Sequence, residues 1–83
     1  MIENLERLIV IYEKSSDRLI DEIIIDKNIT LGQLKEIFDY GDDEDMLFVY
    51  RIANENKDRL ERILDIKFDL DKYDYHLDCY LKP

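Results

Sequence analysis

The fold of this chain is decided by its C-terminal stretch, which reads Asp71-Lys72-Tyr73-Asp74-Tyr75-His76-Leu77-Asp78-Cys79-Tyr80-Leu81. Side chains alternate between the two faces of a strand, so residues two apart share a face. One face would carry Tyr73, Tyr75, Leu77, Cys79 and Leu81, and the other Asp74, His76, Asp78 and Tyr80. The first face is apolar enough to enter a core. The second is acidic and aromatic at once, which is more typical of a docking surface than of an active site.

Two further strands are predicted toward the other end of the chain. The apolar residues of Leu5 to Glu13 indicate one strand. The β-branched run at the centre of Arg18 to Asp26 indicates a second. Because only the turn cluster Ser15-Ser16-Asp17 separates them, we expect an antiparallel hairpin.

The middle of the chain predicts two helices and one more strand. Thr30 and Gln33 have the spacing of a capping box, which predicts that a helix begins at Thr30. Gly41 is placed to stop this helix. Its apolar face would carry Leu31, Leu34, Ile37 and Phe38. Next come an exposed acidic loop, Asp42-Asp43-Glu44-Asp45, and an apolar strand from Met46 to Ile52. A second helix then runs from Lys57 to about Asp65, capped by Asn54 or Asn56 and with Leu60, Ile63 and Leu64 on its apolar face.

The predicted order is therefore ββαβαβ, ending in a strand from Tyr73 to Leu81. The simplest way to bury these apolar faces is an α+β fold in which two helices pack on one face of a four-stranded, mainly antiparallel sheet. The pattern does not determine the strand order. It also leaves open whether the helices cross over to parallel strands or pack across the sheet.

Composition indicates one small domain spanning residues 1–83 of an acidic protein. The chain has 83 residues, of which 46% are hydrophobic, and a formal net charge of −9. That charge opposes binding to nucleic acid and to anionic membranes, which need a basic surface. It favours a basic protein partner, although acidity that only maintains solubility is the alternative. A single cysteine excludes an intramolecular disulfide, and no basic-then-apolar segment opens the sequence, so we expect a cytoplasmic protein.

The residues that could carry chemistry do not combine into a catalytic or metal site. His76 and Cys79 are three residues apart, which places them on opposite faces of a strand, and Cys79 is expected to be a small buried hydrophobe. Asp74, His76 and Asp78 share a face but lack the ligands that zinc or calcium prefers. The acidic loop lacks the EF-hand spacing. We therefore expect no enzyme activity, no metal and no cofactor.

Several segments together resemble a group of small, acidic bacterial domains that occur beside polymorphic or contact-dependent toxin genes. The segments are Tyr12-Glu13-Lys14, Leu34 to Phe38, Asp42 to Met46, Val49-Tyr50-Arg51-Ile52, Phe68-Asp69 and Tyr73 to Cys79. The resemblance implies an immunity protein that binds and neutralises a cognate toxin domain, commonly a basic nuclease. It supplies no catalytic residues.

The expected contact surface combines the acidic loop with one face of the last strand. It consists of Asp42, Asp43, Glu44, Asp45, Asp74, His76, Asp78 and Tyr80. The acids would meet lysines and arginines of the toxin, and Tyr80 would act as an aromatic anchor. We expect a monomer in a one-to-one complex. The alternative is a structural or regulatory module without a toxin partner, which could form a homodimer through a sheet edge. A third hypothesis is an enzyme or metal protein.

Overall fold

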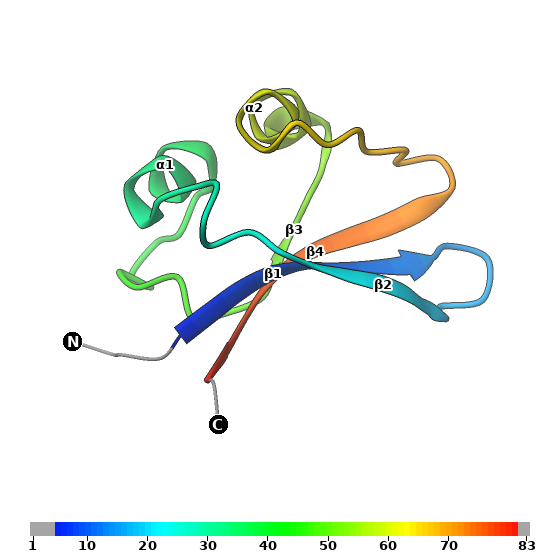
Figure 1. Ribbon diagram of the computed structural model, residues 1–83, viewed down its shortest axis with the longest axis horizontal. Coiled ribbons are helices and arrows are strands. Elements are labelled where there is room, and N and C mark those ends of the chain that lie inside the picture. The colour runs from blue at the N-terminus through cyan, green and yellow to red at the C-terminus, as the bar shows by residue number, and fades with distance from the viewer. Residues whose placement is uncertain (1–4, 82–83) are drawn as a thin grey trace.

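The computed structural model describes residues 5–81, which form two helices and one four-stranded sheet (Figure 1). The elements, in chain order, are β1 (Leu5–Glu13), β2 (Leu19–Ile24), α1 (Leu31–Ile37), β3 (Tyr50–Arg51), α2 (Asn54–Leu64) and β4 (Tyr73–Leu81). The α+β class and the ββαβαβ order are confirmed, and the bounds of the first and last strands are those predicted.

The strand order is β2-β1-β4-β3, and every neighbouring pair is antiparallel. The two long strands form the centre, where β1 and β4 pair without interruption from Leu5–Leu81 to Glu13–Tyr73. Leu8, Ile9 and Val10 of β1 are all buried, which agrees with its central place in the sheet. The helices therefore pack across the sheet and do not connect parallel neighbours.

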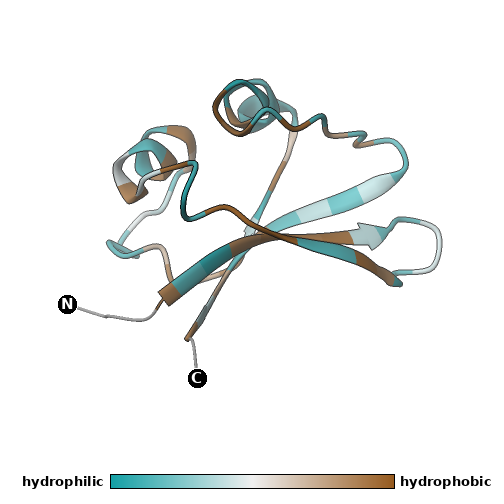
Figure 2. Ribbon diagram, in the orientation of Figure 1, coloured by the Kyte–Doolittle hydropathy of each residue, from teal (hydrophilic) through white to brown (hydrophobic). Residues whose placement is uncertain are grey.

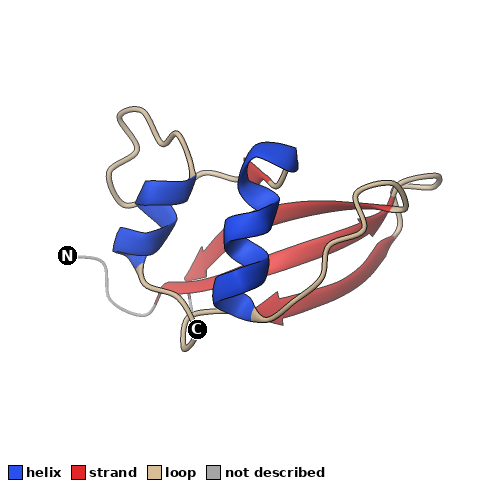
Figure 3. Cartoon of the chain, turned by 90° about the horizontal axis from the view of Figure 1, so that it is seen from above, coloured by secondary structure: helices blue, strands red, loops and turns tan. Residues whose placement is uncertain are grey.

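Both helices cover the same face of the sheet, as Figure 3 shows from above. The core between them is apolar, and Ile9, Leu34 and Leu60 are almost completely buried. The two helices are also linked directly, because the Arg59 guanidinium donates to the Glu36 carbonyl oxygen at 2.9 Å.

The uncovered face has a small apolar centre of its own. Leu8 and Val10 point to this face, where no described helix lies, yet they are only 5% and 2% exposed. The strand register places Ile24 and Asp78 on either side of Leu8, and the side chains flanking Val10 are Glu22 and His76. Side chains of the outer rows therefore shield the centre of this face.

Both helices start as local side-chain chemistry dictates. At α1 the predicted capping box is confirmed: the Thr30 hydroxyl accepts from Gln33 N–H at 3.1 Å, and the Gln33 side chain accepts from Thr30 N–H at 2.9 Å. The second helix begins earlier than predicted, at Asn54, and its N-cap is Ala53. Asn56 still contributes, because its side chain accepts from Ala53 N–H at 2.8 Å.

Four sequence predictions about local structure are wrong in detail. Helix α1 ends at Ile37 with an extended Phe38, so Gly41, with a φ of 56°, bends the following loop and does not stop the helix. Strand β2 spans Leu19–Ile24, which is shorter than the predicted Arg18–Asp26, and it has a bulge at Ile20. The third strand contains Tyr50 and Arg51 alone, and residues 46–49 belong to a loop. Cys79 is half-buried rather than buried.

Candidate protein-binding surfaces

The loop between α1 and β3 is organised around the carboxylate of Asp43. One oxygen accepts from Leu47 N–H at 3.0 Å, and the other accepts from Phe48 N–H at 3.0 Å and from the Tyr50 hydroxyl at 2.6 Å. In a longer third strand the Phe48 N–H would face β4, so its bond to Asp43 takes a donor that such a strand would have used. Asp43 is thus a structural residue of the loop and does not project its charge outward.

The pKa shifts of Asp43 and Tyr50 follow from the same contacts. Desolvation by the loop raises the pKa of Asp43, but the hydrogen bonds from Tyr50, Leu47 and Phe48 outweigh it and hold the pKa below its ordinary value. Burial and the bond to Asp43 raise the pKa of Tyr50 to about 12. Both shifts preserve a charged carboxylate and a protonated hydroxyl near neutral pH.

Two further contacts anchor the loop to the helix-covered side of the sheet. Met46 has a left-handed backbone, with a φ of 51°, and its side chain is buried in the core. The Arg7 guanidinium, which comes from β1, donates to the Asp45 carbonyl oxygen. The loop is therefore an ordered part of the fold.

The ordered loop displays three consecutive apolar side chains to solvent. These are Leu47, Phe48 and Val49, which we call the apolar tip, and Phe48 is 72% exposed. Exposed apolar groups gathered at one place mark interaction sites more often than isolated ones do. Because Asp43 and Met46 already hold the backbone, a partner that binds the tip would not need to order it first.

The four acids beside the tip differ in how far they are available to a partner. The carboxylates of Asp42 and Asp45 are exposed, and neither is within ion-pair distance of a cation among the described residues. Glu44 is paired with Lys35 at 3.0 Å, and this hydrogen bond raises the pKa of Lys35. Asp43 points inward, so two of the four predicted loop acids remain outward and unpaired.

The predicted residues of the last strand lie on the uncovered face and are already engaged with neighbours. Asp74 lies 3.5 Å from the Arg51 guanidinium and 3.9 Å from the Lys14 ammonium. The His76 ring packs against the Tyr12 ring with centroids 5.5 Å apart.

The other two residues of this group sit nearer the end of β4. Asp78 accepts from Cys79 N–H at 2.8 Å and also bonds the Tyr80 hydroxyl, which raises the pKa of Tyr80. Tyr80 is exposed, as predicted. These four residues share one face of the sheet, and the loop is anchored from the other side.

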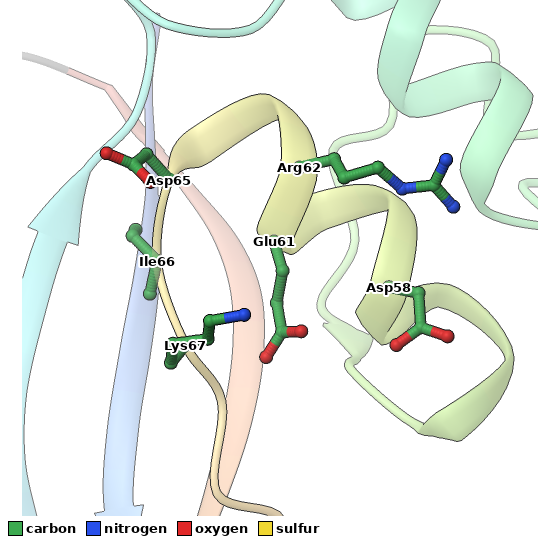
Figure 4. Close-up of a pocket in the computed structure, with 6 residues that line it drawn as sticks. All are labelled: Asp58, Glu61, Arg62, Asp65, Ile66 and Lys67. Atoms are coloured by element: carbon green, nitrogen blue, oxygen red, sulfur yellow. The ribbon is translucent and has the colours of Figure 1, made fainter.

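A surface hollow of about 600 Å³ lies along the end of α2 (Figure 4). Its Glu61 carboxylate accepts from Phe68 N–H at 2.8 Å and pairs with Lys57 at 3.1 Å, and the first of these bonds is the main reason that its pKa is lowered. Glu61 therefore joins α2 to the segment that follows it.

A smaller hollow, of about 190 Å³, lies on the uncovered face beside Tyr12, Asp17, Asp74 and His76. No group of three potential metal ligands gathers anywhere in the described part of the chain. Within the same residues, neither helix has the length and apolar character needed to cross a bilayer.

Sequence reasoning missed the apolar tip and the exposed apolar side chains of β2. The run Met46 to Ile52 has the composition of a buried strand, so its three exposed residues could not be separated from its buried ones. Nothing in the local pattern indicates that Asp43 would take the backbone donors of Leu47 and Phe48. On β2, the pattern did not show that this strand would lie at an edge.

Fold and surface together define a small acidic α+β domain whose most distinctive features are exposed apolar groups beside carboxylates. The chain belongs to the family described as Domain of unknown function (DUF7683), whose model matches residues 6–78. The match covers the whole sheet except its outermost residues, together with both helices. No curated protein and no solved structure matches the chain.

Proposed function

We propose that this chain is a non-catalytic binding domain that captures a basic protein partner, and that the partner is a bacterial toxin domain which it neutralises. The observation that carries the proposal is the apolar tip, held in place by Asp43 and flanked by the outward carboxylates of Asp42 and Asp45. A fixed aromatic side chain with charged surroundings is the usual form of an interface anchor.

The charge of the domain supports a basic partner. The chain carries 21 acids against 12 bases, so its field would attract a positively charged surface and repel an acidic one. Electrostatic attraction of this kind mainly accelerates association, whereas a buried aromatic anchor slows dissociation. Charge and tip therefore have separate kinetic effects, which can be tested separately.

A toxin nuclease is the partner that the sequence resemblance implied. Nucleases hold phosphates with lysine and arginine, so their clefts are basic and complement an acidic inhibitor. In this proposal the tip and the acids beside it enter or border that cleft. Asp74, His76, Asp78 and Tyr80 stay proposed contacts on the uncovered face, with Tyr80 as the exposed anchor.

The charge contribution is tested with the inactivated form of a basic toxin domain, taken from beside this chain if one is encoded there. Asp42→Lys combined with Asp45→Lys should slow association and flatten its salt dependence. These two positions are preferable to Asp43 and Glu44, because Asp43 holds the loop and Glu44 is paired. The control, Asp58→Lys with Asp71→Lys, makes the same change of charge at exposed positions away from the tip. Equal effects of the two double variants would contradict a local contact at the loop.

The anchor is tested with Phe48→Ala. If Phe48 fills a pocket of the toxin, dissociation should be faster and affinity weaker by roughly 2 kcal/mol, or about 30-fold. Val49→Thr, which changes an exposed neighbour by less, is the matched control. Unchanged dissociation of Phe48→Ala would remove the tip from the interface, and absence of any binding to the toxin by the wild type would overturn the proposed function.

The exposed apolar side chains of β2 are the one observation that favours the alternative, a homodimer through the sheet edge. Sedimentation of the wild type across a wide concentration range distinguishes the two. A stable dimer would favour the alternative, and a monomer would support the one-to-one complex.

A further inference from the structure

Strand β2 forms one edge of the sheet and has an unpaired side. It pairs with β1 alone, and Ile25 N–H donates to the Arg7 carbonyl oxygen at 3.1 Å. Backbone groups of successive residues in an antiparallel pair point alternately toward and away from the partner. The groups of Ile23 therefore face β1, and those of Glu22 and Ile24 face away from the sheet.

The outward backbone of β2 is accompanied by exposed apolar side chains. Leu19, Ile20 and Ile24 are 51%, 42% and 57% exposed. Both ends of the strand are apolar and its centre, at Asp21 and Glu22, is hydrophilic (Figure 2). Proteins usually shorten, charge or cover an edge of this kind, because it can pair with another strand.

The acidic centre opposes pairing of β2 with a second copy of itself. An antiparallel second copy centred on the strand must match outward residues with outward residues. The central registers place Glu22 opposite Glu22 or Asp21 opposite Asp21, and like charges directly opposite are destabilising. The acidic centre therefore opposes the homodimer that the exposed apolar side chains of β2 alone would favour, and it favours a strand with cations at its centre.

The Asp21 side chain also occupies the donor that an incoming strand would use. Its carboxylate accepts from Glu22 N–H at 2.8 Å. An incoming carbonyl oxygen would replace this carboxylate oxygen, and the released carboxylate could then pair with a lysine or arginine of the incoming strand. A basic strand compensates for the contact that it displaces, whereas a neutral or acidic strand does not.

We propose that the outer edge of β2 binds an extended basic segment of a partner protein as an added antiparallel strand. Lysine or arginine of that segment lies opposite Asp21 and Glu22, and apolar residues lie opposite Ile20 and Ile24. Backbone hydrogen bonds to Glu22 and Ile24 provide affinity, and the side chains provide specificity. This site is separate from the apolar tip and does not depend on the toxin proposal.

The test uses the full chain labelled with ¹⁵N and a short synthetic peptide that has adjacent Lys and Arg at its centre and Val and Thr on either side. Strand addition should change the amide signals of Glu22 and Ile24 and slow their hydrogen exchange more than those of Asp21 and Ile23. A peptide N-methylated at the residue opposite Glu22 keeps the side chains but lacks the backbone donor, and it should bind at least about tenfold more weakly. Equal binding of the methylated and unmethylated peptides would overturn the proposal.

Charge selectivity is tested by reversal. Asp21→Lys with Glu22→Lys should lose the basic peptide and gain a peptide in which Glu replaces Lys and Arg. Ile24→Pro removes an outward N–H without removing a donor to β1, so the variant should fold and lose peptide binding. If the variant does not fold, the comparison with the N-methylated peptide still tests strand addition. Signal changes confined to the apolar tip or the uncovered face would overturn the proposal. The proposal would also be overturned if, without peptide, the Glu22 and Ile24 amides became more protected from hydrogen exchange as the protein concentration rises. A second copy of the chain would then occupy the edge.

Discussion

Asp43 accepts three hydrogen bonds from residues that follow it within seven positions, and in doing so it decides the conformation of a whole loop. A carboxylate that caps backbone donors can replace the partners that a strand would have supplied. Its neighbour Asp42 has the same side chain but leaves it exposed to solvent. Two adjacent aspartates thus have different roles: Asp43 holds the loop, and the charge of Asp42 is available to a partner.

We expect Asp43→Asn to destabilise the protein at neutral pH, with an effect that shrinks in acid. The folded pKa of Asp43 is lower than its ordinary value of 3.8, so its carboxylate stabilises the fold above that pH. This contribution is lost as the pH falls through the lower folded pKa, and the variant lacks it at every pH. Urea unfolding of both proteins at pH 7 and near pH 3 should show the difference narrowing. Asp42→Asn is the control, and a difference that stays constant with pH would contradict the role given to the Asp43 charge.

At the scale of elements, side chains next to backbone donors decide where helices begin and how strand edges are protected. Thr30 and Gln33 cap α1 reciprocally. The Asp21 carboxylate, on the outer strand β2, accepts from the N–H of the following residue. The Asp78 carboxylate does the same on β4, the strand beside the short β3. The two aspartates occupy donors that the sheet itself leaves unpaired.

Replacement of the α1 cap should have a measurable cost. Thr30→Ala removes the oxygen that accepts from Gln33 N–H, and we expect a loss of about 1 kcal/mol of unfolding free energy. In a domain of this size that loss corresponds to a melting temperature lower by about 4–8 °C. Thr30→Ser keeps the oxygen and should be nearly neutral. Equal destabilisation by both substitutions would point to the lost methyl group and not to the cap.

At the scale of the whole molecule, the excess of acids acts against folding as well as for binding. The formal net charge is −9, and the ion pairs of the described residues lie at partly or fully exposed positions, where each contributes little. Mutual repulsion of the remaining carboxylates is reduced by salt, because the Debye length falls from about 30 Å at 0.01 M to about 10 Å at 0.1 M. Salt should therefore have opposite effects on stability and on association with a basic partner.

We expect the melting temperature to rise by several degrees when NaCl is raised from low to physiological concentration. The variant with Asp42→Lys and Asp45→Lys has a net charge of −5, since each substitution adds two charges to −9, and its response should be smaller. Differential scanning fluorimetry of both proteins over a salt series makes the comparison. A melting temperature that falls with salt would show that attractive ion pairs outweigh the repulsion.

Local patterns predicted most of the elements, because their causes lie within a few residues. The alternation of Tyr73–Leu81 and the apolar run of Leu5–Glu13 identified both central strands with their bounds. The spacing of Thr30 and Gln33 identified the start of α1. Boundaries failed at β3, where the Asp43 carboxylate takes the Phe48 N–H, and at the start of α2, where Asn56 accepts from Ala53 N–H. Both contacts are local in sequence, but the residue pattern does not distinguish them from the alternatives.

The candidate site was less predictable than the fold. Exposure of Tyr80 followed from strand alternation, but the hydrogen bonding of the Asp43 carboxylate within its loop and the pairing of Asp74 with Arg51 did not. The apolar tip was missed because the run Met46–Ile52 has no pattern that separates its exposed residues from its buried ones.

By itself, the sequence determined the α+β class, the order of the elements, the two faces of β4 and the acidity of the surface. All of these depend on side-chain period, local capping and composition. Only the tertiary structure decided that β2 lies at an edge, that β1 is buried on both faces, and which acids are free. These properties depend on pairings between residues far apart in the chain, such as Arg7 with Cys79 and with Asp45, and no local pattern contains them.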